Sequence, residues 1–160
     1  MEIILIIIYG LALTFILAYS FVQIILVINY LKKKTKPASK PLLIDEDFPI
    51  VTIQLPLYNE LYVVNRLIDS VCQLDYPKDK LEIQLLDDST DETVDFVAKK
   101  VEEYKAKGFN IYQHRRTDRT GFKAGALAEG VDICKGEFIA IFDADFLPKK
   151  HFLKETIPHF

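Results

Sequence analysis

Hydrophobic and polar positions follow one pattern before residue 48 and another after it. From Ile3 to Leu31 no charged residue occurs in 29 positions. A helix over these residues would measure about 43 Å, which exceeds the roughly 30 Å of bilayer hydrocarbon. After Phe48, short apolar stretches alternate with stretches of helical periodicity. The pattern predicts one transmembrane helix followed by a folded domain.

Four strands are predicted in the folded domain, each from a short run rich in apolar and β-branched residues. They cover residues 50–55, 81–86, 110–113 and 138–142, of which the third is the weakest. Pro56 is expected to close the first strand because proline cannot donate to a sheet ladder.

Helices are predicted between these strands from apolar positions spaced three and four residues apart. The two repeats are Leu61, Val64, Ile68 and Val71, and then Val94, Val97, Val101 and Tyr104. Asn59 is expected to cap the first helix. Ser89 and Glu92 have the spacing of a capping box for the second, and Gly108 is expected to end it. With a third helix over 123–133, the alternation predicts an α/β domain whose mostly parallel sheet is covered on both faces.

The flanks of the apolar segment predict its orientation. Nothing basic precedes it, and five lysines follow it: Lys32, Lys33, Lys34, Lys36 and Lys40. The positive-inside rule then places the rest of the chain in the cytoplasm, anchored to an inner or plasma membrane. A cleaved signal peptide is the alternative, but its apolar region is normally about 7 to 15 residues long and follows a basic stretch. We expect a helix and basic flank at 1–34, a linker at 35–47 and the folded domain at 48–160.

The charge of the chain argues against a nucleic-acid partner. The sequence has 20 basic and 23 acidic side chains and a net charge of −3, which offers no broad surface for a polyanion. Cys72 and Cys134 have neither the spacing of a zinc site nor the number for a disulfide framework. We expect both to be small buried hydrophobic side chains in a reducing compartment.

Polar side chains follow every predicted strand. In an open parallel sheet the strand ends share one edge, and ligands bind there. The residues at this edge are Tyr58, Asn59 and Glu60; Asp87 and Asp88; His114, Arg115 and Arg116; and Asp143 and Asp145. For Asp87 in particular, a structural role near a helix N-terminus is the alternative.

Asp143 and Asp145 come directly after the fourth strand and are separated by one alanine. On an extended backbone residues i and i+2 point to the same side, so the two carboxylates are expected to converge. Paired like charges need a cation or a shared proton, and oxygen-only ligands favour Mg²⁺ or Mn²⁺. Because phosphate oxygens usually complete the shell of such an ion, the pattern predicts a metal-bridged diphosphate at this strand end.

A basic stretch between the third and fourth strands fits the same ligand. Residues 114–127, HRRTDRTGFKAGAL, contain Arg115, Arg116, Arg119 and Lys123. Arginine and lysine side chains bind diphosphate oxygens, and a helix that begins near Lys123 would add its N-terminal dipole. A solvated basic loop is the alternative for each of these side chains. Lys123 is the favoured phosphate ligand among them.

Four motifs, in this order and spacing, resemble those of the processive family 2 glycosyltransferases. They are PLYNE at 56–60, LLDDSTDET at 85–93, RTGFKAGAL at 119–127 and IFDADF at 141–146. They look most like those of cellulose-synthase-like enzymes and glucomannan 4-β-mannosyltransferases. The resemblance implies a Rossmann-like GT-A fold. It also implies transfer of a hexose, with inversion, from a nucleotide diphosphate sugar such as a UDP- or GDP-hexose to a growing polysaccharide or other glycan acceptor.

The resemblance implies roles for residues on the nucleotide side. Tyr58 and Glu60 would line the nucleobase pocket. Asp88, with Asp87 beside it, would contact the nucleoside, and Lys123 would lie near the donor diphosphate.

The resemblance implies a D-x-D motif at Asp143 and Asp145, which would hold the metal and the ribose or diphosphate. Asp145 would be the more direct metal ligand, and the metal would act as a Lewis acid toward the departing nucleoside diphosphate. The family's catalytic aspartate base and its Q-x-x-R-W segment have no match up to Phe160, so the base is expected beyond this residue.

The motifs are compatible with two other functions. A non-catalytic, nucleotide-sugar-binding membrane subunit would carry the same motifs. The IFDADF segment also resembles the D-x-D nucleophile motif of haloacid-dehalogenase-type phosphatases, in which Asp143 would attack phosphorus. The base and sugar of the donor are not determined by these motifs.

Overall fold

A computed structural model describes residues 2–32 and 48–160 of the chain. Contacts within the chain divide it into two units, Met1–Lys40 and Pro41–Phe160, and each unit is described by itself. The predicted linker at 35–47 and the lysines after Lys32 lie outside the described residues.

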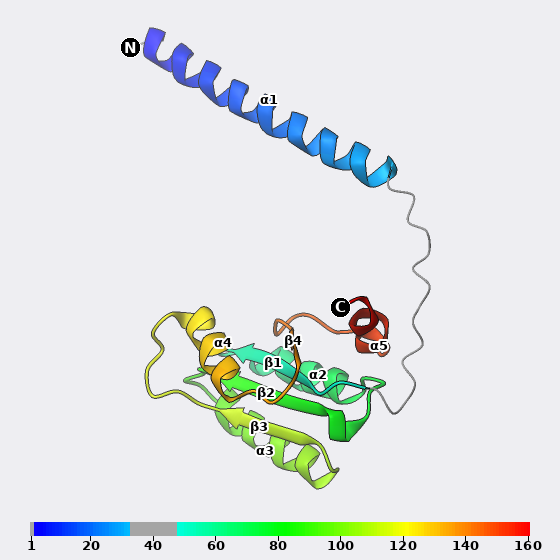
Figure 1. Cartoon of the computed structure of the whole chain (residues 1–160). Helices are drawn as coiled ribbons and strands as arrows, with labels where there is room; N and C mark the ends of the chain where they lie inside the picture. Colours follow the sequence, from blue (N-terminus) through cyan, green and yellow to red (C-terminus); the bar gives the residue numbers. More distant parts are fainter. Residues whose placement is uncertain (1, 33–47) are drawn as a thin grey trace. The chain divides into compact units, whose positions relative to one another are not determined.

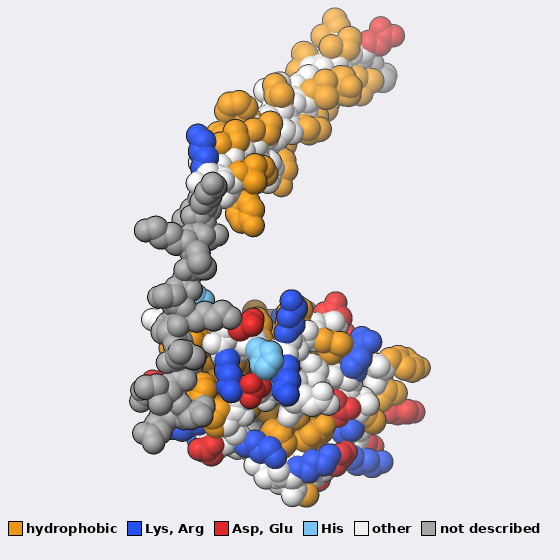
Figure 2. All heavy atoms as spheres, turned by 90° about the vertical axis from the view of Figure 1, so that its right-hand side faces the viewer, with side chains coloured by type: hydrophobic (Ala, Val, Ile, Leu, Met, Phe, Trp, Pro, Cys, Tyr) orange, Lys and Arg blue, Asp and Glu red, His pale blue; other side chains and the backbone are white. Residues whose placement is uncertain are grey.

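The first unit contains the helix α1 (Glu2–Lys32), which is long and apolar enough to cross a bilayer. None of its most apolar stretch is buried. Hydrophobic side chains cover it along its length (Figure 2). The hydroxyls of Thr14 and Ser20 donate to the carbonyls of Gly10 and Ile16, so they need no partner outside the helix. The expected apolar helix is therefore present as a candidate membrane span.

The second unit is built on a parallel sheet of four strands (Figure 1). The strands are β1 (Val51–Leu57), β2 (Leu81–Asp87), β3 (Asn110–His114) and β4 (Phe138–Ile141), in the order β3-β2-β1-β4. All three pairings are parallel. The predicted parallel α/β sheet is confirmed, and its four carboxyl ends lie at one edge.

Pro56 lies inside β1, so the prediction that it closes this strand is wrong. Residues of a parallel strand bond alternately to its two neighbours. The carbonyl of Leu57 accepts from Asp88 N on the β2 side, and the carbonyl of Gln54 accepts from Phe142 N on the β4 side. By this alternation Pro56 faces the β4 side, beyond the end of the β4 pairing at Gln54. The missing N–H of Pro56 therefore removes no hydrogen bond from the sheet.

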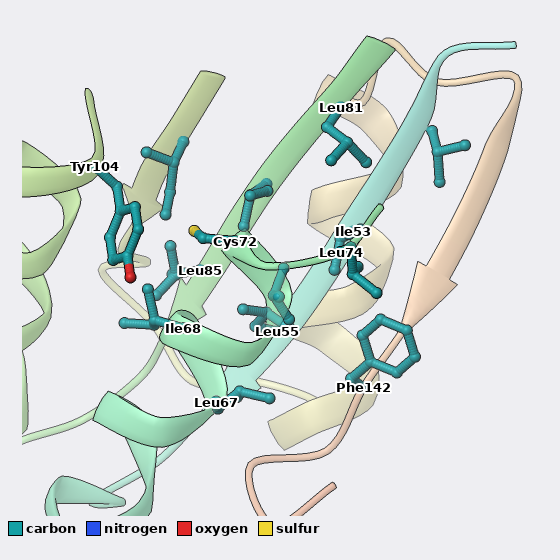
Figure 3. Close-up of a cluster of buried hydrophobic side chains, with 14 of the residues drawn as sticks. Ile53, Leu55, Leu67, Ile68, Cys72, Leu74, Leu81, Leu85, Tyr104 and Phe142 are labelled. Atoms are coloured by element: carbon teal, nitrogen blue, oxygen red, sulfur yellow. The ribbon is translucent and has the colours of Figure 1, made fainter. Parts of the chain in front are cut away.

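Helices cover both faces of the sheet. The helices α2 (Leu61–Cys72) and α3 (Thr93–Ala106) pack on one face, and α4 (Phe122–Ile133) packs against β1 and β2 on the other (Figures 1 and 3). The shorter elements are the turns η2 (Lys78–Lys80) and η3 (Ile157–His159) and the helix α5 (Phe152–Thr156).

The predicted helix starts are wrong in detail. The N-cap positions of α2 and α3 are Glu60 and Glu92, and neither makes a side-chain capping bond. Asn59 instead bonds across to Thr90, and the Ser89 hydroxyl accepts the backbone N–H of Asn59. These polar groups join two strand ends, which is a tertiary role that local capping rules do not detect.

The face of the sheet under α2 and α3 is apolar. It carries Ile53, Leu55, Ile83 and Leu85, which are at most 1% exposed. The side chains of Leu67 and Ile68 on α2 pack into the same cluster (Figure 3), and both are fully buried. Cys72 belongs to this cluster, as expected, and burial raises the pKa of its thiol to about 12. Cys134 is also a free thiol but is only partly buried, so the expectation of a buried side chain is wrong for this cysteine.

The opposite face, under α4, carries polar side chains that are as deeply buried. Thr52 and Glu82 lie opposite each other in register, as do Gln54 and Gln84, and all four are at most 1% exposed. Thr52 Oγ1 donates to Glu82 at 2.6 Å, and Gln54 Nε2 donates to Gln84 at 3.0 Å. We call these four side chains, together with Tyr112, the polar ladder.

Tyr112 closes the polar ladder on β3. Its hydroxyl accepts a bond from Gln84 Nε2 at 2.8 Å and donates to Glu82 at 3.3 Å. Burial, followed by the charge of Glu82, raises the pKa of Tyr112 to about 12. The helix α4 lies directly on this ladder, because a Cβ at Gly130 would come within 2.6 Å of Gln54 Nε2 and 3.0 Å of Gln84 Oε1.

Candidate functional site

Tyr58 and Glu60 follow directly after β1, and Asn59 between them holds the backbone of this segment in place. Asn59 has a left-handed φ of 56°, which asparagine tolerates better than most residues. Its N–H donates to Ser89 Oγ at 2.9 Å, and its side-chain oxygen accepts from Thr90 N at 2.9 Å. The exits of β1 and β2 are therefore joined, and Tyr58 and Glu60 lie exposed beside the end of β2.

The exit of β2 carries Asp87 and Asp88, and the structure gives them different surroundings. Asp87 is 1% exposed, and its oxygens accept bonds from Ser89 N and from Gln113 Nε2. It does not line the pocket at the strand ends. Asp88 does line that pocket, and Arg116 binds both of its oxygens at 3.0 and 2.5 Å. The bonds to Asp88 raise the pKa of Arg116.

The loop after β3 does not direct all of its basic side chains to one place. Arg115 donates to the carbonyl of Ser89, and Arg116 is occupied by Asp88. His114 pairs with Glu129 on α4. None of these three lines the pocket, so the hypothesis that Arg115 and Arg116 bind phosphate is not supported.

Arg119 and Lys123 do reach the pocket, from the loop and from the first turn of α4. The Arg119 guanidinium lies over the Tyr58 ring, 3.3 Å from its centroid, which is cation–π geometry. Lys123 forms an ion pair with Asp143 that joins α4 to the exit of β4. Both side chains of this pair are about half exposed, at 52% and 57%.

Asp143 and Asp145 follow β4 in a turn rather than on an extended backbone, which corrects the predicted local geometry. The strand ends at Ile141, and Phe146 N donates to the carbonyl of Asp143 at 3.0 Å. Both carboxylates are nevertheless exposed and line the same pocket.

A pocket of about 450 Å³ lies between the strand ends and α4. It is lined by six of the seven predicted site residues, namely Tyr58, Glu60, Asp88, Lys123, Asp143 and Asp145. Arg119 also lines it, so the pocket has four acidic and two basic side chains. A diphosphate would add further negative charge, and a bound cation is the simplest way to balance it.

Part of the pocket lining was missed by sequence reasoning. Pro56 and Leu86, which lie opposite each other in register, contribute apolar contacts, as does Ala126 on α4. The alternation of side chains along β1 and β2 could have revealed these residues. Pro56 lies two residues after Gln54, and Leu86 two residues after Gln84, so each points to the same face of the sheet as its glutamine, nearer the strand end.

The donor set of the pocket fits a hard divalent cation. Asp143 and Asp145 offer only oxygen atoms, which suit Mg²⁺ and Mn²⁺ better than zinc. Across the described residues, no group of three or more His, Cys, Asp and Glu side chains could hold a metal alone. A cation at Asp143 and Asp145 would therefore depend on oxygens from a ligand or from water.

Sequence comparison places the folded domain among known proteins. The sequence model of glycosyl transferase family 2 matches residues 52–160. A probable glucomannan 4-beta-mannosyltransferase 7 from Oryza sativa subsp. japonica is 48% identical over 116 residues, which are 70% of this chain and 20% of the relative. Glucomannan 4-beta-mannosyltransferase 2 from Arabidopsis thaliana is 41% identical over 150 residues, which are 88% of this chain and 28% of the relative. The chain thus spans between a fifth and just over a quarter of these relatives.

Solved structures with the same fold include nucleotide complexes. A mannosyltransferase from Pyrobaculum calidifontis, in complex with GDP-Man and Mn²⁺, superposes with a TM-score of 0.67 and 31% identity over 82% of this chain and 39% of its own. S. aureus TarS 1-349 in complex with UDP superposes with a TM-score of 0.59 and 27% identity, over 68% of this chain and 31% of its own. The expected GT-A fold is therefore confirmed.

Proposed function

The chain belongs to glycosyltransferase family 2, and on that premise we propose that it forms the donor-binding part of a membrane-anchored, inverting hexosyltransferase. Its donor is a UDP- or GDP-hexose, and its product is a polysaccharide or another glycan. The helix α1 is the bilayer anchor, and the folded domain faces the cytoplasm. Membership of family 2 argues against the phosphatase alternative.

The observation that carries this proposal is the convergence of six side chains from three strand ends and α4 on one pocket. Tyr58 and Glu60 form the side for the nucleobase, and Asp88 lies at the exit of β2 for the nucleoside. Lys123, Asp143 and Asp145 form the side for the diphosphate. The complexes of the Pyrobaculum mannosyltransferase with GDP-Man and Mn²⁺, and of TarS with UDP, support a nucleotide-sugar donor and a divalent cation as the ligands.

Lys123 and the pair Asp143 and Asp145 are proposed to have different roles at the diphosphate. Asp143 and Asp145 would hold a divalent cation, Mg²⁺ or Mn²⁺, which as a Lewis acid stabilises the charge of the leaving nucleoside diphosphate when it is bound. Lys123 starts from its ion pair with Asp143 and, as a mobile point charge, can donate to a phosphate oxygen of the donor.

The side for the nucleobase is closed by Arg119 in this structure. Its guanidinium covers one face of the Tyr58 ring at 3.3 Å. A base that stacks on this face must displace the guanidinium, which can then turn toward the phosphates. Arg119 is therefore proposed to contact the donor together with Lys123.

Calorimetric titration of the full chain in detergent micelles tests the proposal. GDP and UDP are titrated in Mn²⁺ and again with excess chelator, and at least one of them is expected to bind only in the presence of the metal. Asp145→Asn is expected to abolish this binding, whereas Asp132→Asn, at an exposed position of α4 outside the pocket, serves as the matched control. Equal affinity with and without chelator would contradict the proposal.

A further inference from the structure

Arg116 makes four hydrogen bonds that connect the end of β2 to the start of α4. Its Nε and Nη2 donate to the two oxygens of Asp88 at 3.0 and 2.5 Å. Its Nη1 donates to the carbonyl of Thr120 at 3.0 Å, and Nη2 also donates to the carbonyl of Phe122 at 2.9 Å. The side chains of Arg116 and Asp88 are only 6% and 7% exposed. This one guanidinium therefore fixes two segments that are distant in the sequence.

The segment that Arg116 holds has an unusual backbone. Gly121 and Phe122 both have left-handed φ values, 74° and 49°. Glycine adopts this region freely, but an aromatic residue there is uncommon and needs its surroundings to hold it. The bonds of Arg116 to the carbonyls of Thr120 and Phe122 lie on either side of Gly121 and hold this conformation.

Gly125 shows how closely α4 approaches the Arg116 side chain. A Cβ at Gly125 would lie 2.6 Å from Nη1 of Arg116 and 2.1 Å from the carbonyl oxygen of Thr120. Only a residue without a side chain fits between them. The first turn of α4 is thus set directly against the guanidinium.

The two basic side chains that reach the pocket lie on either side of the held segment. Arg119 precedes it and covers Tyr58, and Lys123 follows it and pairs with Asp143. The direction of both side chains depends on the turn at residues 120–122. A change of this turn would move both cations relative to Asp143.

Arg116 itself has little capacity left for a ligand. Of its five N–H donors, four are used within the protein, and the side chain is buried. It does not line the pocket. A direct bond to phosphate would require it to leave Asp88, a buried carboxylate that would then keep only the longer ion pair with Arg119 Nε, at 3.8 Å.

We propose that Arg116 is a positioning residue that acts through Asp88 and the turn at 120–122 to place Lys123 and Arg119 for the donor diphosphate. This inference rests on the proposed function for the identity of the ligand. The placement of the turn is a property of the chain alone and can be measured without a nucleotide.

Hydrogen exchange of the full chain in detergent measures the placement directly. Arg116→Ala is expected to speed amide exchange in residues 119–125 by about tenfold or more, while β1 and β2 exchange as in the wild type. Arg66→Ala, at an exposed position of α2, is the matched control and should change neither region. Unchanged exchange in 119–125 would overturn the proposal whether or not the wild type binds a nucleotide.

A double-mutant cycle tests whether Arg116 acts through Lys123. With GDP or UDP and Mn²⁺, Arg116→Ala is expected to weaken binding about fivefold or more. If it acts through Lys123, the double variant with Lys123→Met should bind no more weakly than the weaker of the two single variants. Fully additive losses would instead mean that Arg116 contacts the ligand by itself, and would overturn the proposal.

Two further measurements separate positioning from general damage to the fold. Arg116→Lys keeps the positive charge but loses the forked guanidinium donors. Its amide exchange in 119–125 and its nucleotide affinity should therefore lie between those of the wild type and of Arg116→Ala. The same variant serves as the test if Arg116→Ala does not fold. Guanidinium ion, far below denaturing concentration, should restore part of the affinity of Arg116→Ala, whereas sodium chloride at equal ionic strength should not. If the wild type binds no nucleotide while exchange in 119–125 responds as expected, the proposed function fails and the positioning role stands.

Discussion

The two faces of the sheet are equally buried and have opposite chemistry. Under α2 and α3, β1 and β2 present Ile53, Leu55 and Leu85, whereas under α4 the same strands present the four buried side chains of the polar ladder. Burial of apolar area is non-directional and mainly adds stability, while a buried hydrogen-bond network fixes a single geometry. Lys123 and Ala126, which line the pocket, belong to α4 on the polar face. The comparison indicates that one face stabilises the domain and the other positions the site.

The largest effect is expected on the apolar face. Ile68→Ala removes a fully buried side chain of α2, and such a change lowers the free energy of unfolding by about 2–5 kcal/mol. Tyr62→Ala, at a position of the same helix that is 97% exposed, should change it by less than about 0.5 kcal/mol. Chemical denaturation followed by circular dichroism measures both. Equal stability of the two variants would contradict the assigned core.

A smaller loss is expected on the polar face. Glu82→Ala leaves Thr52 Oγ1 and the N–H of Lys135, which both donate to this carboxylate, without their acceptor, at a cost of about 1–3 kcal/mol. Hydrogen exchange should also rise in α4, because this helix packs on the polar ladder. Glu102→Ala, at a surface ion pair of α3, is the control. A variant as stable as wild type, with unchanged exchange in α4, would show that the polar ladder does not position this helix.

At the site, a substitution is expected to weaken nucleotide binding with little change in the stability of the fold. Lys123→Met removes a cation that is half exposed and paired only at the surface, so the free energy of unfolding should change by less than about 1 kcal/mol. The affinity for GDP or UDP in Mn²⁺ should fall about three- to tenfold, because a charge-assisted bond to phosphate is lost. Unchanged affinity would remove Lys123 from the diphosphate side of the pocket.

The smallest effect concerns proton binding in the apolar core. The thiol of Cys72 has a pKa raised from 9.0 to about 12 by burial, with a further contribution from Asp69. Because the folded pKa lies above the unfolded one, the stabilising contribution is complete below about pH 9 and is lost as pH rises toward 12. Between about pH 9 and 10, before tyrosines ionise in the unfolded chain, the unfolding free energy of the wild type should fall more steeply than that of Cys72→Ala. Equal slopes would contradict the raised pKa.

The sequence predicts the sheet, its helices and most of the site because these depend on local periodicity and on the residues directly after each strand. Tyr58, Asp88 and Asp145 could be placed at one edge because parallel strands must end together. For Asp87 the sequence left a structural role open beside a role in the site, and local signals could not decide between them. The decisive contact is with Gln113, 26 residues further along the chain, which donates to the buried Asp87 carboxylate.

Two of the differences share one physical cause, which is competition between local signals and partners from distant strands. Asn59 and Ser89 have capping chemistry, but they bond to each other's strand exits across 30 residues. Arg116 has the chemistry of a phosphate ligand, but it is bound by Asp88, 28 residues earlier in the sequence. Such pairings depend on strand order and register, which a single sequence does not specify.

The central claim is that the strand ends form a metal-dependent site for a nucleoside diphosphate. Anomalous X-ray scattering from crystals of the full chain grown with GDP or UDP and Mn²⁺ tests it most directly. We predict one manganese peak in contact with the Asp145 carboxylate and the phosphate oxygens, with the nucleobase beside Tyr58. A nucleotide bound in the pocket without manganese, or a manganese peak away from Asp143 and Asp145, would contradict the claim.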